Sequence, residues 1–262
     1  MGRIEVNIKI LVATHKFYKM PSDPMYLPIH LGRKDHDDLG FIGDNTGDNI
    51  AAKDPHYAEL SALYWGWKNL DVDVLGLVHY RRLLTIHSFL GYRIRGKWNS
   101  TLTQAELENL IKKVPIILPN KRRYYIETNE SHYVHAQEPE PLKVTRQVIY
   151  EKWPSYAESF ERVMKRTWAH MFNIFIMRKP ILDEYCSWLF NILFELEKRI
   201  NTSDYPISGR RLFGYVSEPL LDVWLENVKY DTLEFNLMFM ENQHWPRKIL
   251  RFLKRKYFGC HE

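Results

Sequence analysis

The stretch Val74-Leu75-Gly76-Leu77-Val78-His79-Tyr80-Arg81-Arg82 decides the fold class, because an apolar strand runs directly into a cluster of cations. Two arginines at the end of a buried strand need a partner for their charge, and a guanidinium binds phosphate or carboxylate well. Ligands of α/β proteins lie beyond the carboxyl ends of strands. The stretch predicts the floor of a site for an anion, although a solvated strand end with a salt bridge fits the same residues.

The residues before this stretch predict a βαβ beginning. Residues 4–14 form a near-continuous apolar run, which is typical of a buried parallel strand, and residues 26–30 form a second short strand. Asp54-Pro55 then begins a helix with apolar positions at helical spacing, and the strand of residues 72–78 follows. Strand, loop, helix and strand in this order indicate an α/β fold.

The rest of the chain continues the alternation. Thr103 and Glu106 form a capping box for a helix over residues 103–113. We expect further helices at 142–153, 154–167, 180–200 and 212–226, strands at 114–118, 173–177 and 230–240, and long loops at 32–54 and 120–142. These elements predict one α/β domain over residues 1–245 with a helical insertion, followed by a tail at residues 246–262.

Composition narrows the class of protein. The chain has 262 residues, 45% hydrophobic and 26% charged, as in an ordinary globular protein. Its net charge of +5 is concentrated in residues 247–256, and no nucleic-acid-binding motif is present, which argues against nucleic acid as a partner. Two cysteines without a CxxC motif indicate neither a zinc site nor a disulfide framework. Without a signal-peptide pattern or a long apolar stretch, we expect a cytoplasmic location.

The tail has its own pattern. Within residues 246–258, apolar side chains gather on one helical face and cations on the other, the composition of an interfacial helix. Each basic residue near an anionic leaflet contributes about 1 kcal/mol. We expect peripheral attachment to the inner face of the cell membrane, with a helix docked on the domain or a nucleic-acid patch as the alternatives.

Several motifs carry a family resemblance over roughly residues 7 to 230. They are Gly43-Asp44-x-x-Gly47-x-Asn49-Ile50, Glu59-Leu60-x-x-Leu63-Tyr64-Trp65-x-Trp67-Lys68-Asn69, Gly76-Leu77-x-His79-Tyr80-Arg81-Arg82 and Gly214-Tyr215-x-Ser217-Glu218-x-Leu220-Leu221. The chain resembles the DUF4422-type family of bacterial capsular and exopolysaccharide glycosyltransferases.

The resemblance implies a fold and a reaction. The fold is a GT-A-like, Rossmann-type mixed sheet flanked by helices. The reaction transfers a hexose, galactose in its pyranose or furanose form, from a UDP-sugar to a hydroxyl of a growing, lipid-linked surface polysaccharide. An inverting mechanism is favoured, and a non-catalytic nucleotide-sugar or glycan-binding protein of the same fold is the alternative.

The resemblance also implies site residues. Donor contacts are expected from Thr14, His15, Lys16, Asn49, Lys53, His79, Tyr80, Arg81 and Arg82. Acceptor contacts are expected from Tyr124, Tyr133 and Asn173.

Catalysis by inversion needs a general base for the acceptor hydroxyl, and Glu218 is the predicted one, near a helix start that Ser217 caps. A first-turn helix acid is the structural alternative for Glu218. His79 and His170 are the other base candidates. Glu59 is expected to support Arg81 or Arg82 as an ion-pair partner.

The metal question follows from one departure. Many GT-A enzymes hold Mg²⁺ or Mn²⁺ on the diphosphate with an Asp-x-Asp, and here Arg81 and Arg82 occupy the corresponding strand end. Fixed guanidiniums can neutralise a leaving diphosphate without metal. We therefore expect no metal cofactor, and the alternative is Mg²⁺ or Mn²⁺ held by Asp44 and Asp48.

Overall fold

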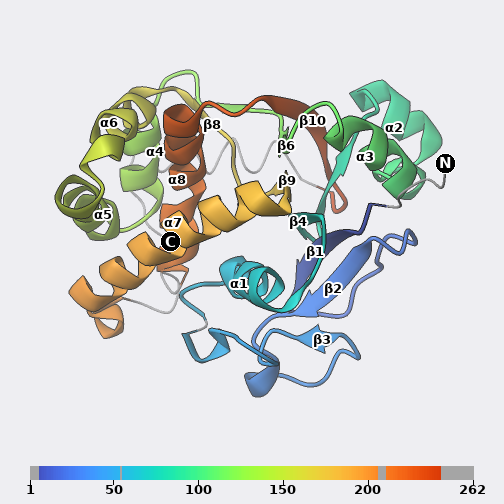
Figure 1. The fold of residues 1–262 in the computed structure, drawn as a ribbon, viewed down its shortest axis with the longest axis horizontal. Helices are drawn as coiled ribbons and strands as arrows, with labels where there is room; N and C mark the ends of the chain where they lie inside the picture. Colours follow the sequence, from blue (N-terminus) through green and yellow to red (C-terminus); the bar gives the residue numbers. More distant parts are fainter. Residues whose placement is uncertain (1–5, 54, 206–210, 243–262) are drawn as a thin grey trace.

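The computed structural model describes residues 6–53, 55–205 and 211–242 (Figure 1). Its strands are β1 (Ile8–Thr14), β2 (Tyr26–His30), β3 (Ile42–Gly43), β4 (Val74–His79), β5 (Arg82–Thr85), β6 (Ile116–Pro119), β7 (Arg122–Arg123), β8 (Trp168–Ala169), β9 (Phe175–Arg178) and β10 (Thr232–Phe239). Its α-helices are α1 (Glu59–Asn69), α2 (Phe89–Arg95), α3 (Gln104–Ile111), α4 (Asn129–Ala136), α5 (Pro139–Lys152), α6 (Ala157–Lys165), α7 (Lys179–Arg199) and α8 (Leu212–Val228).

The main sheet is mixed and partly closed. Its order is β3-β2-β1-β4-β5-β10-β6-β9, and β9 also pairs with β4. β1 runs parallel to β2 and β4, with Thr14 opposite His30 and Ala13 opposite His79. The carboxyl ends of these strands therefore meet at one edge of the sheet, as the βαβ pattern predicts, and this edge carries the His79-Tyr80-Arg81-Arg82 run.

Two apolar cores lie on opposite faces of the sheet. In β1, Leu11 and Ala13 pack into the core that α1 and α7 cover, while Ile10 and Val12 pack into the core that includes α3. Since every one of these four side chains is almost fully buried, β1 has no polar face. This explains the continuous apolar run, which is typical of a strand covered on both sides.

Three helices between β7 and β8 form what we call the helical insertion. Helices α4, α5 and α6 lie between β7 and β8 in the chain, and Figure 1 shows them gathered with α8 on one side of the molecule, far from β2 and β3. β7 and β8 form a separate two-stranded sheet in which Arg122 lies opposite Ala169. The insertion therefore supplies a second wall facing the edge of the main sheet.

Two boundary predictions are wrong. The helix predicted from Asp54 begins at Glu59, and Asp54 itself lies outside the described residues. The His56 carbonyl accepts hydrogen bonds from the Phe213 and Gly214 amides at the start of α8, so the segment before α1 is bonded to another helix. The loop predicted over residues 120–142 contains β7 and α4, which begins after a Thr128–Ser131 capping box.

Glu218 and Ser217 do not lie near a helix start, contrary to the prediction. Both are in the second turn of α8, followed by Pro219 within the same helix. The Ser217 hydroxyl donates to the Gly214 carbonyl and to Asn173 Oδ1, so it is not an N-cap. α8 begins at Leu212, the first residue of the helix predicted at 212–226, so Ser217 lies inside it.

Two findings concern the chain's relation to a membrane. Among the described helices, none is both long and apolar enough to cross a bilayer. The interfacial helix expected at residues 246–258 lies outside the described residues.

Candidate functional site

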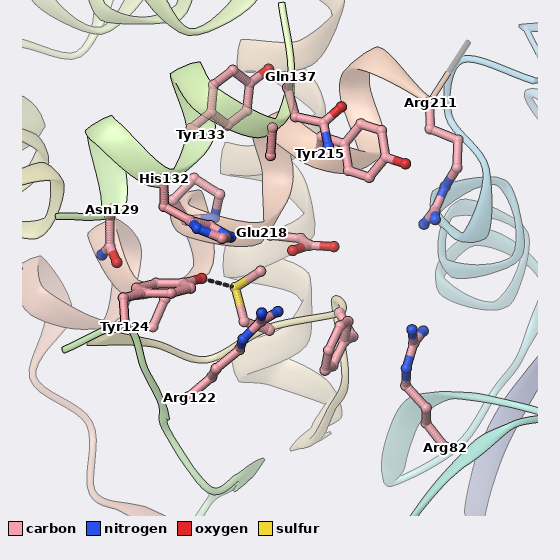
Figure 2. A pocket seen from close by; sticks show the side chains of 15 residues that line it. Arg82, Arg122, Tyr124, Asn129, His132, Tyr133, Gln137, Arg211, Tyr215 and Glu218 are labelled. Carbon is pink, nitrogen blue, oxygen red and sulfur yellow. Dashed lines mark hydrogen bonds between the residues drawn. The ribbon is translucent and has the colours of Figure 1, made fainter. Parts of the chain in front are cut away.

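A cavity of about 260 Å³ lies between the helical insertion, α8 and the start of β5. Figure 2 shows its polar wall: Arg82, Arg122, Tyr124, Asn129, His132, Tyr133, Gln137, Arg211, Tyr215 and Glu218. The remaining lining residues are Ala136, Ala169, Met171, Phe172 and Pro219. Three guanidiniums thus surround a cavity whose described lining contains a single carboxylate.

Helix α8 provides one wall of the cavity. Arg211 precedes the helix, and Tyr215 and Glu218 follow at intervals of four and three residues, which places all three on one helical face. The Glu218 carboxylate points into the hollow between Arg211 and Arg82 on one side and His132 on the other (Figure 2). This spacing follows from the helix predicted at 212–226, which starts at the same residue as α8.

Glu218 has the electrostatic properties of a proton acceptor. Its side chain is 7% exposed. Burial, together with the negative charge of Glu59, raises its pKa to about 7, although Arg211, Arg82 and the Phe172 amide favour the ionised form. A carboxyl group that titrates near neutral pH can take a proton from a substrate hydroxyl and return it to solvent.

A strained turn at Phe172 and Asn173 lies next to Glu218, whose carboxylate accepts a hydrogen bond from the Phe172 amide. Phe172 and Asn173 have φ angles of 77° and 53°, a region that residues other than glycine rarely adopt. Asn173 explains the strain, because its amide donates to Glu59 Oε1 at 2.8 Å and to the Gly214 carbonyl at 3.0 Å. The buried Asn173 does not line the cavity, so its predicted role as an acceptor contact finds no support in this geometry. It ties α1 to α8 instead.

Glu59 is the central partner of this network. Its carboxylate is 1% exposed and accepts from Arg211 Nη2 at 2.5 Å, while His79 Nε2 lies 3.8 Å from Oε1. The expected partners, Arg81 and Arg82, are not the ones it binds. Burial alone would raise the pKa of Glu59, but His79, Arg211 and Asn173 hold that pKa well below its usual range. Glu59 therefore stays ionised and fixes Arg211 at the cavity wall.

Replacing Glu59 with glutamine should lower the free energy of unfolding by about 2–3 kcal/mol. Breaking a buried ion pair typically costs about 3–5 kcal/mol. The lower figure applies because the Arg211 side chain remains 37% exposed and can be solvated. Urea denaturation of the wild type and E59Q at neutral pH measures the difference, and identical midpoints would contradict it.

The same pair predicts a pH dependence. Since the folded-state pKa of Glu59 is depressed below the unfolded value near 4.5, its contribution is present above that pH and is lost as the pH falls toward the folded-state pKa. The stability curves of wild type and E59Q should converge on acidification. A difference that stays constant down to pH 3 would show that Glu59 acts by packing alone.

Arg82 joins the β4–β5 turn to the cavity. It begins β5, which the sequence analysis did not predict, and pairs with His79 across the turn. Its guanidinium stacks on Phe172 at 4.0 Å, and burial together with the charge of Arg81 lowers its pKa. No acid forms an ion pair with Arg82 among the described residues. It is a fixed cation whose donors can bind an anion.

Arg81 belongs to a second surface, at the ends of β1 and β4. Its Nη1 lies 3.5 Å from Glu241, as does Lys16 Nζ. Both cations approach the ring of Tyr80, whose buried hydroxyl has no hydrogen-bond partner in the described structure. His15 and Tyr18 contact the same ring edge-on. The consecutive arginines thus connect the cavity to an aromatic, cationic surface.

Thr14 stabilises the turn that follows β1. Thr14 is fully buried, and its hydroxyl donates to the Lys16 carbonyl at 2.6 Å, which shapes the turn after β1. Burial and the positive charges of Arg81 and Lys16 lower the pKa of His15, so its ring is neutral at neutral pH. The structure therefore brings together His15, Lys16, Tyr80 and Arg81 of the predicted donor contacts.

Asn49 and Lys53 do not line the cavity. The Asn49 amide donates to the Gly47 carbonyl within its own loop, and Lys53 pairs with Glu197 at 2.7 Å. These two residues have partners that explain them without a ligand.

The alternative metal ligands lie in structural contacts. Asp44 is fully buried and accepts from the Ser61 hydroxyl at 2.7 Å, and Asp48 receives a hydrogen bond from Tyr64. In the described parts of the chain, no group of three or more His, Cys, Asp and Glu side chains is arranged to hold a metal ion. The side chains that line the cavity do not fit Mg²⁺ or Mn²⁺, because these ions prefer oxygen ligands and the guanidiniums would repel them.

His132 is a cavity residue that the sequence analysis did not single out. Its Nδ1 lies 2.9 Å from the buried Glu127 carboxylate, and its ring stacks on Tyr124 at 4.1 Å. Because a carboxylate can only accept, Nδ1 carries the proton and Nε2 remains an acceptor. Burial lowers the pKa of His132, so the ring is neutral at neutral pH. His170, a predicted alternative base, is buried against Asp222 and does not line the cavity.

Comparison with known proteins gives two matches. The family described as "Domain of unknown function (DUF4422)" matches residues 9–229. The apo structure of WbbM, a bifunctional glycosyltransferase, is similar to this chain with a TM-score of 0.80 and 26% sequence identity. The match covers 90% of this chain and 46% of the WbbM chain, so this chain spans about half the length of that protein. No curated protein matches the sequence.

Proposed function

This chain belongs to the DUF4422 family, and we propose that it is a glycosyltransferase that moves a hexose from a UDP-sugar to a hydroxyl of a surface polysaccharide. One observation carries the proposal: a carboxyl group whose pKa is about 7 shares a cavity with two fixed guanidiniums, those of Arg82 and Arg211. Sugar transfer needs both a proton acceptor and a cation for the leaving diphosphate. The likeness to a glycosyltransferase over most of the chain supports the same reading.

In the proposed reaction, the acceptor hydroxyl attacks the anomeric carbon while Glu218 takes its proton. A bond forms between the acceptor oxygen and the sugar, the bond from the sugar to the diphosphate breaks, and UDP leaves with the electron pair. Arg82, supported by Arg211, stabilises the charge that develops on the diphosphate. With one base on the acceptor side, the reaction inverts the anomeric configuration.

We assign the two halves of the UDP-sugar to two different places, the surface around Tyr80 and the cavity. The surface of His15, Lys16, Tyr80 and Arg81 lies at the carboxyl ends of β1 and β4, where α/β proteins bind nucleotides, and we assign the uridine half to it. The cavity, at about 260 Å³, is slightly smaller than the ~300–1,000 Å³ typical of small-molecule sites, so it fits a sugar ring better than a whole nucleotide sugar. The proposal therefore includes a GT-A-like arrangement of the donor, with the uridine half at the strand ends and the sugar in the cavity.

The insertion wall receives the acceptor. Tyr124 and Tyr133 line the cavity opposite Arg82 and Arg211, as the predicted acceptor contacts require. Flat aromatic surfaces next to polar groups suit sugar rings. Galactose as the transferred sugar, its ring form, a lipid-linked acceptor, and attachment of residues 246–258 to the inner leaflet remain predictions.

The test is UDP release from a panel that includes UDP-galactopyranose, UDP-galactofuranose and UDP-glucose, with a glycoside acceptor, with and without EDTA. With one of the UDP-sugars, we expect UDP release that depends on the acceptor. This release should persist in EDTA, since the cations that line the cavity are arginine side chains. Loss of activity in EDTA would reject the metal-free mechanism and favour Asp44 and Asp48. Donor binding without release under any condition would favour the non-catalytic alternative.

A further inference from the structure

Arg122 is a cation of the cavity that the proposed reaction does not use. It lies on β7, in the small sheet of the insertion, and its guanidinium points toward the hollow that Glu218 faces (Figure 2). Its nearest ring is that of Tyr124, with 5.4 Å between the guanidinium carbon and the ring centroid. In the described parts of the chain, no acid forms an ion pair with Arg122. It is therefore available to a ligand.

The cavity's cations belong to opposite walls. Arg82 begins β5 and Arg211 precedes α8, and Figure 2 shows their guanidiniums on the same side of the hollow. Arg122 instead comes from β7 of the insertion, where its guanidinium lies 5.4 Å from the ring centroid of Tyr124. An anion bound by Arg82 and Arg211 therefore leaves Arg122, which is exposed to solvent, without an anionic partner.

We propose that Arg122 binds an anionic group, a carboxylate or a phosphate, on the acceptor, and that the enzyme selects acidic acceptors. This inference rests on the proposed function, since it assigns the insertion wall to the acceptor. A guanidinium presents paired N–H donors that match either anion. The adjacent polar contacts, His132 Nε2 and the Gln137 amide, suit the hydroxyls of the same sugar. Arg122 thus determines specificity and takes no part in proton transfer.

The first experiment measures binding without transfer. Methyl glucoside, methyl glucuronide and methyl glucoside 6-phosphate differ only at C6, so their dissociation constants, measured by ligand-observed NMR, isolate the effect of charge. We expect at least one anionic glycoside to bind about tenfold or more tightly than the neutral one, the effect of a charge-assisted hydrogen bond. Comparison of the two anions distinguishes a carboxylate from a phosphate. Equal binding of all three would overturn the proposal.

The second experiment uses a matched pair of variants. The neighbouring Arg123 is a matched control, because it has the same charge and is exposed like Arg122 but does not line the cavity. R122A should abolish the preference for the anionic glycoside with unchanged binding of the neutral one, and R123A should retain the preference. R122K should retain part of it, because a point charge replaces the planar fork.

The readout separates this inference from the proposed function. If no donor supports transfer, the binding preference and its loss in R122A still test Arg122. If transfer occurs, R122A should raise the KM of an acidic acceptor and leave the KM of the donor unchanged. A raised donor KM with unchanged acceptor preference would assign Arg122 to the diphosphate and overturn the proposal.

Discussion

Replacing Glu218 with glutamine should lower kcat by about 10²–10⁴-fold, the usual contribution of a general base. Glutamine keeps the size of the side chain and can still accept the hydrogen bond from the Phe172 amide. It cannot take a proton from the acceptor hydroxyl. The measurement is acceptor-dependent UDP release at saturating donor, with UDP binding followed separately so that chemistry is distinguished from affinity.

The pH profile gives an independent reading of the same residue. A base must be deprotonated, and burial raises the pKa of Glu218 to about 7, so kcat/KM should rise with pH through about 7 and then level off. The limb should disappear in E218Q. A raised carboxyl pKa also costs stability above the unfolded value near 4.5, so E218Q should be at least as stable as the wild type at pH 8. Loss of activity with retained stability excludes simple unfolding.

Glu226 offers the matched control for Glu218. It lies two turns further along α8, where its carboxylate pairs with Arg162 and Arg166 outside the cavity. E226Q removes a carboxylate from the same helix and should leave kcat within about twofold, since such partly exposed pairs contribute little. If E218Q were as active as E226Q, Glu218 would be a structural helix acid and the binding-protein alternative would gain support.

The fold class could be predicted from the sequence because the patterns that indicate it involve residues close together in the chain. The continuous apolar run of β1 and the Thr103–Glu106 capping box each follow from neighbouring residues; α3 lies close to its predicted bounds, and β1 ends at Thr14 as predicted but begins at Ile8. The start of α1 could not be found this way. His56 is bonded to the first turn of α8, more than 150 residues away, and no local pattern records that contact.

The candidate site divides along the same line. Glu218, Arg82, Tyr124 and Tyr133 were predicted and do meet in one cavity, whereas Arg122, Arg211 and His132 were not singled out. Arg211 could have been found from its helical spacing to Glu218. Arg122 and His132 could not, because the loop prediction over residues 120–142 hid the strand and helix that aim them. Which acid pairs with which arginine could not be predicted either, since Glu59 and Arg211 are 152 residues apart in the sequence.

Replacing Arg82 with alanine should lower kcat/KM for the donor by about 10²–10³-fold, the effect of removing one fixed donor from a developing oxyanion. The reason is position: Arg82 is stacked on Phe172, has no acid partner in the described structure, and shares the cavity with Glu218. R82K should recover part of the activity, because lysine restores the charge but not the planar fork. Steady-state kinetics at varied donor concentration measure both variants.

Comparing R81A with R82A tests which of the two arginines stabilises the leaving diphosphate. Arg81 follows Tyr80 directly, but its side chain is 40% exposed and lies 3.5 Å from Glu241. R81A should therefore weaken UDP binding several-fold and change kcat little, whereas R82A should lower kcat itself. The opposite order, with R81A inactive and R82A near wild type, would move the diphosphate from the cavity to the Tyr80 surface. Because Glu218 is assigned as the base through the cavity that it shares with Arg82, both assignments would then fail together.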